Sequence, residues 1–269
     1  MKRILYTLLL AVTMASTAKA QCPQENTAFK SGEVLQYNLY FNWKFVWVKC
    51  GTATMSCVNS RYKGKPAMRA NLITRGSKQA DKFFVMRDTL TCYTSTDMVP
   101  MYYKKAAREG DRYYIDEVWY NYDDNGKAAL RQHRINDEGR HTWKNATSTD
   151  CVHDMLSTFL YARSFDPSEW KAGKSIKLPM VDGKKFSEGE LKYNGKETVK
   201  GDDGKNYRCL SLSYIEKEDN EKKEIVRFFI TDDSNHIPVR LDMFLRFGSA
   251  KAFIKGMKNV KSKITCIEK

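Results

Sequence analysis

The sequence is poor in the residues and motifs from which common catalytic and metal sites are built. Only four histidines occur, and none are spaced as in an HExxH zinc motif. No Cys-x-x-Cys pair is present, which argues against thioredoxin-like redox chemistry and against a zinc site of two such pairs. The glycine fingerprints of nucleotide binding and the Gly-x-Ser-x-Gly elbow of serine hydrolases are also absent. The sequence therefore predicts no catalytic residues, no metal and no cofactor.

Long hydrophobic runs are missing after the first twenty residues. The chain starts with Lys2-Arg3, continues with an apolar run over 4–12, and has the small residues Ala18-Lys19-Ala20 before a cleavage point. This arrangement predicts a secretory signal peptide over residues 1–20. No later segment approaches the eighteen apolar residues of a membrane-spanning helix. We expect a mature chain, 21–269, that is periplasmic or secreted and has no transmembrane anchor.

All seven cysteines lie in the predicted mature chain, so at least one thiol stays unpaired if the others form disulfides. Cys22 is the second residue after the predicted cleavage point and raises the question of a lipoprotein, in which the cysteine becomes the first residue. The residues before it, Lys19-Ala20-Gln21, lack the large apolar residue of a lipoprotein signal, which favours soluble export. Cysteines in strand-like surroundings, such as Cys209, are expected to be buried free thiols.

The formal net charge is +14, but no signature of nucleic-acid binding accompanies it. The positive residues are dispersed lysines rather than clustered arginines, which is typical of a solvated surface with lysines along sheet edges. We therefore expect no nucleic-acid partner. The densest cluster of lysines, within residues 251–263, is the strongest exception to this interpretation of the lysines as a solvated surface.

The clearest pattern is strict alternation of apolar and polar residues. It covers residues 35–47, and returns over 239–247 and 260–266. A period of two predicts strands with one buried face. Ten further β-rich runs bring the expected number of strands to about a dozen. These runs lie near residues 50–58, 67–74, 83–94, 101–108, 112–122, 128–135, 175–180, 188–199, 206–215 and 225–231.

Tight-turn signals between these runs predict antiparallel pairing. Asn-Gly and Asp-Gly steps accommodate the positive φ of hairpin turns, and they occur within 123–126, 194–195 and 202–204. The charged stretch 216–224 is expected to be a hairpin loop. We predict a mainly β fold, in which a large antiparallel meander sheet curves into an open barrel.

One segment has helical spacing instead. Its apolar residues form one stripe, made of Val152, Met155, Leu156, Phe159 and Leu160. This predicts an amphipathic helix near residues 150–163 that lies across the sheet or plugs its mouth. Thr149 or Asp150 would cap its start, and Asp166-Pro167 would keep the helix from continuing. The mature chain then forms a single β-rich domain, or two halves, 25–148 and 165–269, that share one core.

Several short motifs follow one another along nearly the whole mature chain. They are Phe29–Tyr37, Gly51, Val85–Asp88, Met98–Pro100, Ala107–Gly110, Asp154–Arg163, Tyr207–Leu210, Thr231–Arg240 and Gly248–Ala250. In this order they resemble the DUF3108 family of exported bacterial proteins, a domain of unknown function. The resemblance implies an envelope-associated protein built on a large meandering sheet that curves into an open barrel. It implies no catalytic residues, because none is established for the family.

An aromatic run suggests a binding surface. If the curved sheet leaves a cavity, its lining would include Tyr37, Phe41, Trp43, Phe45 and Trp47. Such rings bind acyl chains or stack on sugars. The alternative is that they form the core between sheet and helix, since a half-buried sheet needs an apolar face in any case.

Three functions agree with these features. The first is a non-catalytic exported protein that binds or carries a lipid-like apolar ligand or a glycan in the concavity of its sheet. The second is an envelope glycan hydrolase, and the third is a structural interaction protein that uses sheet edges or lysines. A hydrolase would draw a carboxylate pair from Glu33, Asp88, Asp116, Asp232 and Asp233. A purely apolar cavity would favour the first function, and two carboxylates within about 5–10 Å the second.

Two polar motifs have simpler interpretations. Residues one and two apart on a helix do not face each other, so we interpret Cys151–Asp154 as a capped helix start with a half-exposed histidine. Asp232–Asn235 lacks the spacing of a calcium loop and is typical of a turn. The other histidines, His133, His141 and His236, are scattered along the chain.

Overall fold

The structure is a computed structural model. It describes residues 23–43, 46–164, 169–183, 185–218, 221–245 and 248–268. The predicted signal peptide, Cys22, Phe45 and the Asp166-Pro167 stop lie outside these residues. The described part contains a fifteen-stranded antiparallel sheet, a two-stranded sheet and one α-helix, so the prediction of a mainly β fold is confirmed.

The first eight strands form an uninterrupted meander in which each pairs with the next. They are β1 (Glu33–Trp43), β2 (Val46–Tyr62), β3 (Lys65–Gly76), β4 (Met86–Thr94), β5 (Pro100–Glu109), β6 (Arg112–Tyr122), β7 (Ala128–Ile135) and β8 (His141–Ser148). A 3₁₀ turn, η1 (Ala80–Lys82), lies between β3 and β4. The predicted turn at 123–126 connects β6 and β7.

The second half adds a further series of strands to the same sheet. They are β9 (Ser175–Lys177), β12 (Gly189–Lys200), β13 (Asn206–Glu218), β14 (Glu221–Thr231), β15 (Pro238–Leu245), β16 (Gly248–Lys258) and β17 (Ile267–Glu268). A small hairpin of β10 (Met180–Asp182) and β11 (Lys185–Ser187) stands apart from it. Because β1 pairs with both β2 and β16, the two halves form one continuous sheet.

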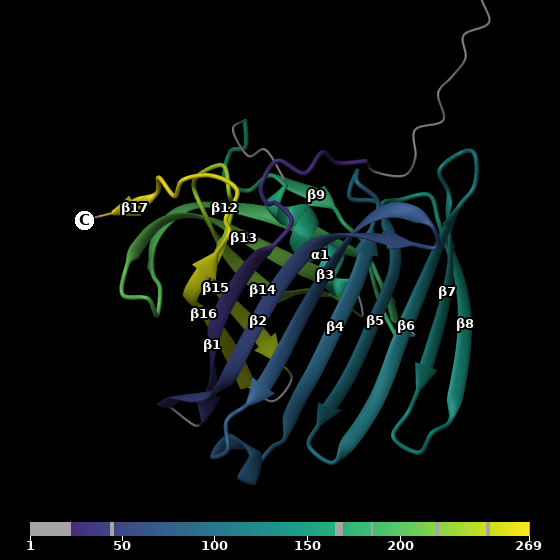
Figure 1. The fold of residues 1–269 in the computed structure, drawn as a ribbon, viewed down its shortest axis with the longest axis horizontal. Helices are drawn as coiled ribbons and strands as arrows, with labels where there is room; N and C mark the ends of the chain where they lie inside the picture. The colour runs from purple at the N-terminus through teal and green to yellow at the C-terminus, as the bar shows by residue number, and fades with distance from the viewer. Residues whose placement is uncertain are drawn as a thin grey trace, which may run out of the picture.

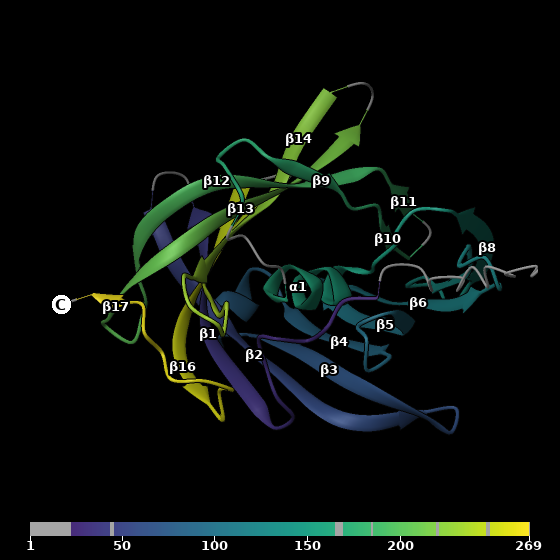
Figure 2. The ribbon, with the colours of Figure 1, turned by 90° about the horizontal axis from the view of Figure 1, so that it is seen from above.

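The sheet curls around the helix α1 (Met155–Arg163), as Figures 1 and 2 show. Among the described residues it does not close, because β8 pairs only with β7 and β9 pairs only with β12. The hairpin β10–β11 lies between these two free edges (Figure 2). The result is an open barrel with a seam, which we define as the gap between β8 and β9.

The core fills the concave side of the sheet. Leu156 and Leu160 of α1 belong to the same buried cluster as strand residues such as Leu35, Cys92 and Val239. The buried surface of the helix differs from the predicted apolar stripe. Ser157 and Thr158 are also buried, while Met155, a residue of the stripe, is 40% exposed. The apolar concavity is therefore occupied by the protein itself.

The predicted start of the helix is wrong by five residues. The helix begins at Met155 rather than near 150, and its N-cap is Asp154 rather than Thr149 or Asp150. The preceding residues are held in an extended conformation, because the backbone of His153 bonds to Pro179 and Val181 beside β10. Pairing with a partner segment outweighs local helical spacing here.

Four further local predictions are corrected. The alternating residues 260–266 are irregular, and the strand β17 follows them. Asn194-Gly195 forms a bulge inside β12, where Gly195 takes a positive φ of 118°, rather than a hairpin turn. Most of the predicted loop 216–224 belongs to β13 and β14. Strand β8 was not predicted, since its solvent-exposed residues have no apolar alternation.

Candidate ligand-binding site at the open seam

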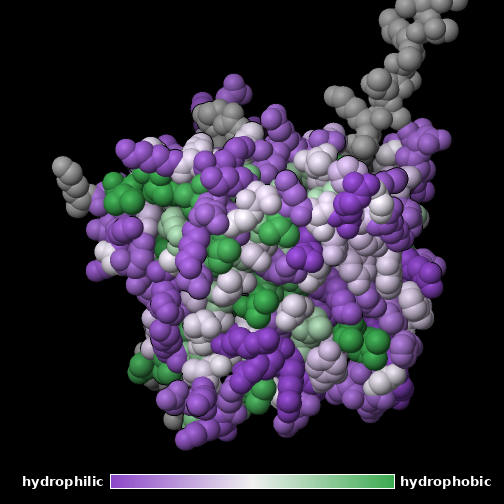
Figure 3. Space-filling view, in the orientation of Figure 1, coloured by the Kyte–Doolittle hydropathy of each residue, from purple (hydrophilic) through white to green (hydrophobic). Residues whose placement is uncertain are grey.

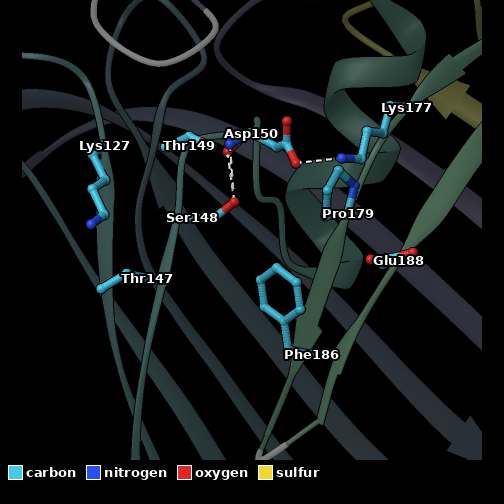
Figure 4. Close-up of a pocket in the computed structure, with 9 residues that line it drawn as sticks. All are labelled: Lys127, Thr147, Ser148, Thr149, Asp150, Lys177, Pro179, Phe186 and Glu188. Carbon is cyan, nitrogen blue, oxygen red and sulfur yellow. Dashed lines mark hydrogen bonds and ion pairs between the residues drawn. The ribbon is translucent and has the colours of Figure 1, made fainter.

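A pocket of about 390 Å³ lies at the seam (Figure 4). One wall comes from the β7–β8 side and the segment leading to α1, and consists of Lys127, Thr147, Ser148, Thr149 and Asp150. The other wall comes from β9 to β11 and consists of Lys177, Pro179, Phe186 and Glu188. The pocket exists because the two sheet edges approach without pairing.

Local contacts give the pocket its shape. The ammonium of Lys177 lies 2.6 Å from a carboxylate oxygen of Asp150, so this ion pair connects the two walls. The hydrogen bond from Lys177 to Asp150 raises the pKa of the lysine. The amide of Asp150 donates to the hydroxyl of Ser148 at 3.0 Å. Cys151, the next residue, is disulfide-bonded.

The chemical character of the pocket is mixed. Its walls combine three hydroxyl side chains, two lysines and two carboxylates with the single aromatic ring of Phe186. An acyl chain would desolvate these charges without hydrogen-bonding them, which is unfavourable. A polyhydroxylated ligand can bond to the polar groups and place one face against the ring. Among the described residues, no group of three or more His, Cys, Asp or Glu is positioned to hold a metal.

The five aromatic residues predicted to bind a ligand are not gathered in one place. Tyr37 is buried in the core, where its hydroxyl donates to the carbonyl of Pro238 at 3.0 Å. Trp47 pairs with Asn42 while Phe41 pairs with Val48, so Trp47 and Phe41 lie on opposite faces of the β1–β2 hairpin. The hairpin turns between Trp43 and Val46, and this turn separates the two parts of the alternating run.

The remaining members of that set are only partly defined. Trp43 ends β1, but its side chain is outside the described part of the structure, as is all of Phe45. The ammonium of Lys251 lies 4.4 Å from the ring centre of Trp47, which is on the outer surface. A ligand role for these five residues stays a prediction. Tyr37 agrees with the alternative interpretation, in which the rings form the core.

Three of the five candidate carboxylates, Glu33, Asp232 and Asp233, form contacts that hold other parts of the structure in place. Glu33 is buried and receives two hydrogen bonds from the guanidinium of Arg163. Asp232 bonds to Lys196 and Arg208 on the surface. Asp233 accepts from the amides of Asn235 and Thr265, which confirms the turn interpretation of this motif.

The other two carboxylates, Asp88 and Asp116, belong to a polar group on the concave face of β4 to β7. Asp116 lies opposite Lys105 on β5 and 3.4 Å from the guanidinium of Arg134. Burial raises the pKa of Asp88, and the charge of Glu109 adds to the effect. Burial alone would lower the pKa of Lys105, but the charges around it, Asp182 first, hold that pKa above its usual value.

The predicted half-exposed His153 is in fact buried. It is 1% exposed, and neither ring nitrogen has a hydrogen-bond partner. Burial lowers its pKa to about 3, so the ring is neutral at physiological pH. Asp154 caps α1 through hydrogen bonds from the amides of Leu156 and Ser157, and burial raises its pKa to about 6. Asp154 therefore caps the helix, as the interpretation of a capped helix start requires, whereas the His153 side chain makes no hydrogen bond within the described part of the chain.

Two of the scattered histidines come together on the outer face of the sheet. The imidazole nitrogens of His133 and His141 lie 2.9 Å apart, and His133 also contacts a carboxylate oxygen of Glu117 at 3.0 Å. The ring of Trp143 stacks on His133 with centroids 4.0 Å apart. The β7–β8 hairpin causes this contact, because it returns the chain on itself. The turn signal at Asn136–Gly139 could have indicated it.

Comparison with known proteins gives a family and a fold. A family model described as a protein of unknown function, DUF3108, matches residues 36–255. A β-barrel-like protein of domain of unknown function DUF1849 from Brucella abortus has 9% identity and a TM-score of 0.53, covering 88% of this chain and 100% of its own. No curated protein matches the chain.

A second solved structure is more distant. It is an exported protein with a YmcC-like fold from Bacteroides fragilis, with 10% identity and a TM-score of 0.35, covering 87% of this chain and 99% of its own. The Brucella structure supports the β-barrel-like fold and nothing about activity. Within the described residues, no helix has the length and apolar character needed to cross a bilayer.

Proposed function

The chain belongs to the DUF3108 family, to which no function is assigned, and we propose that it is an exported, non-catalytic protein that binds a glycan in its seam pocket. The observation that carries the proposal is the pocket of about 390 Å³, whose hydroxyls, charges and one ring suit a sugar. This volume falls within the range of ordinary ligand sites. The apolar concavity is filled by α1, which disfavours carriage of an acyl chain there.

Export is part of the same proposal. The predicted signal peptide supports it, and so does the disulfide at Cys151, because disulfides persist in oxidising compartments. We expect the mature protein in the periplasmic or secreted fraction, with a mass that lacks residues 1–20. Recovery of the full-length chain from cytosol would contradict this.

The binding test begins with native mass spectrometry of protein purified from its own envelope fraction, followed by extraction of any bound glycan. Envelope oligosaccharides are then titrated calorimetrically. We expect Phe186→Ala to weaken binding by about tenfold or more, since it removes the stacking surface. Phe244→Ala is the matched control, because this ring is 43% exposed and lies outside the pocket. Equal affinity of both variants for the glycan would overturn the assignment of the site.

A glycan hydrolase is the second candidate, and the raised pKa of Asp88 favours it. A raised pKa suits a general acid, and Asp116 on the same concave face is a candidate for the second carboxylate. Turnover of envelope glycans that disappears in Asp88→Asn, with binding at the seam unchanged, would support this candidate. Absence of turnover by the wild-type protein would reject it.

A further inference from the structure

Several exposed apolar side chains lie at one end of the barrel. The β1–β2, β3–β4, β5–β6 and β15–β16 connections lie there, and we call it the hairpin end (Figure 1). Its exposed large apolar side chains include Val46, Val48, Phe83, Phe84, Phe244 and Leu245. They come from three separate connections that the sheet places at one end, and none belongs to the seam pocket.

The most exposed of these residues is presented by an ordered turn. Phe83 is 85% exposed, yet its amide donates to the carbonyl of Ala80 at 2.9 Å. The amide of Ala80 donates in turn to the hydroxyl of Ser77, and the ring of Phe84 lies close over Gly110. Exposing a phenylalanine of defined backbone position to water is unfavourable unless another apolar phase receives it.

A row of arginines lies beside this turn. Arg75, Arg87 and Arg108 are directly opposite one another on β3, β4 and β5. Together with Asp111 and Tyr113 they line an open groove of about 690 Å³. Like charges in direct cross-strand register are unfavourable, so the row favours an anion as its partner.

The charge of this row is only partly compensated. Asp81 forms a two-point ion pair with Arg87, but in the described part of the chain neither Arg75 nor Arg108 has an ion-pair partner. Figure 3 shows strongly hydrophilic surface gathered toward the lower ends of β3 and β4, with single hydrophobic side chains beside it. Lys78 and Lys82 flank the turn and add to the positive charge.

We propose that the hairpin end docks onto an anionic lipid surface. Phe83 would insert at the boundary between headgroups and acyl chains, with the other exposed apolar residues at the same level, while the arginine row binds lipid phosphates. A polyanionic glycan would satisfy the arginines but leave Phe83 in water. A second copy of the chain would cover the apolar residues but bring two arginine rows together. A lipid surface would receive the exposed apolar residues and also bind the arginine row. The proposal does not depend on the seam pocket.

The test is co-sedimentation of the mature chain with vesicles of phosphatidylcholine alone and with about one-third phosphatidylglycerol added. We expect binding mainly to the phosphatidylglycerol vesicles, weakened by salt. Phe83→Ser and Arg108→Glu should each reduce the partition coefficient by about tenfold or more. Both residues are exposed, so these variants should keep the circular dichroism and melting temperature of the wild type.

Two variants outside the exposed apolar residues of the hairpin end and outside the arginine row are matched controls. Ile267→Ser removes a side chain of β17 that is 44% exposed, and Lys200→Glu reverses a charge at the end of β12. Neither should change vesicle binding. Unchanged binding by Phe83→Ser, or no binding to phosphatidylglycerol vesicles, would overturn the proposal. So would heparin binding without vesicle binding, or a dimer that Phe83→Ser dissociates. Glycan affinity at the seam should be the same in all four variants.

Discussion

At the scale of single residues, the most consequential interaction is a buried ion pair at the end of α1. The guanidinium of Arg163 bonds to both carboxylate oxygens of Glu33 and to the carbonyls of Asn235 and His236. Both charged side chains are almost completely buried. One arginine therefore connects β1, α1 and the β14–β15 turn, which are far apart in sequence.

Removing one partner of this pair should be strongly destabilising. We expect Arg163→Met to lower the free energy of unfolding by about 3–5 kcal/mol, because Glu33 would stay buried without its counter-charge. Urea denaturation followed by tryptophan fluorescence measures the change. The double variant Glu33→Leu/Arg163→Met should recover much of the loss, since no charge is then left unpaired. A single variant as stable as the wild type would show that Glu33 reaches water or another cation.

His153 makes stability depend on pH. Its folded-state pKa of about 3 lies below the ordinary value of 6.5, so the unfolded chain binds the proton more readily than the folded one. The stability contributed by the neutral ring is complete above pH 6.5 and is lost as pH falls toward about 3. Asp154, with its pKa raised from 3.8 to about 6, has the opposite effect, because its contribution is lost as pH rises through that range.

The variant His153→Phe separates these two effects. The new ring has no unpaired nitrogen and can pack against Tyr161, whose ring centre lies 4.6 Å from that of His153. We expect equal or slightly higher stability at pH 7, by about 1 kcal/mol. The advantage over the wild type should grow as pH falls from 6.5 toward about 3. Denaturation curves at several pH values measure it, and a pH-independent difference would contradict the buried neutral histidine.

At the scale of elements, strand β8 depends on few contacts. It is an edge strand whose residues are mostly exposed, and it also forms part of the pocket wall. Apart from its pairing with β7, strand β8 has contacts through Trp143. The ring of Trp143 stacks on His133, and the guanidinium of Arg131 lies 4.2 Å from the ring centre of Trp143. Cross-strand pairs of this kind stabilise the edge of a sheet.

Loss of the Trp143 ring should therefore loosen β8 selectively. An aromatic pair contributes about 0.5–1.5 kcal/mol, so Trp143→Ala should speed amide hydrogen exchange in β8 by up to about tenfold. Exchange in β1 and β16, at the middle of the sheet, should be unchanged. Thr142→Ala, on the same strand but without a ring, serves as the control. Equal acceleration in both variants would show that the stack is unimportant.

At the scale of the whole molecule, the disulfide at Cys151 is the covalent cross-link recorded for the described residues. The five other described cysteines, Cys50, Cys57, Cys92, Cys209 and Cys266, are free thiols. Four of them are buried, Cys57, Cys92 and Cys209 in strands and Cys266 directly before β17, and burial raises the pKa of Cys57 to about 12. Reducing agents should therefore act on stability through Cys151 alone.

Reduction should lower the free energy of unfolding by about 2–4 kcal/mol, the usual effect of one disulfide. Cys151→Ser should have the same effect, and dithiothreitol should change nothing further in that variant. Thermal unfolding with and without reductant measures both. Cys50→Ser, at a free thiol, is the control and should respond to reductant as the wild type does. A wild-type protein indifferent to reductant would contradict a stabilising role for the disulfide.

Much of the fold could be predicted, because strands and hairpin turns are local properties of a chain. The alternation over 239–247 and the turn signal at 202–204 both correspond to elements of the structure. The errors arise where pairing with a segment that is distant in sequence determines the local structure. The backbone of His153 pairs with β10 and delays the helix, and β8 forms against β7 without an apolar pattern of its own.

The candidate site was much less predictable. The aromatic alternation of residues 37–47 is real, but a hairpin turn puts Trp47 and Phe41 on different faces. The walls of the seam pocket come from segments such as 147–150 and 186–188, which have no distinctive motif. Only the curvature of the sheet brings them together.

The sequence by itself determined the antiparallel β character and one helix, since side-chain period and turn chemistry act between neighbouring residues. It also carries the order of motifs that identifies the family. The tertiary structure decided that the sheet stays open at β8 and β9, that α1 fills the concavity, and that apolar and arginine side chains meet at one end. These features depend on the twist and register summed over all the strands, which no local stretch of sequence encodes.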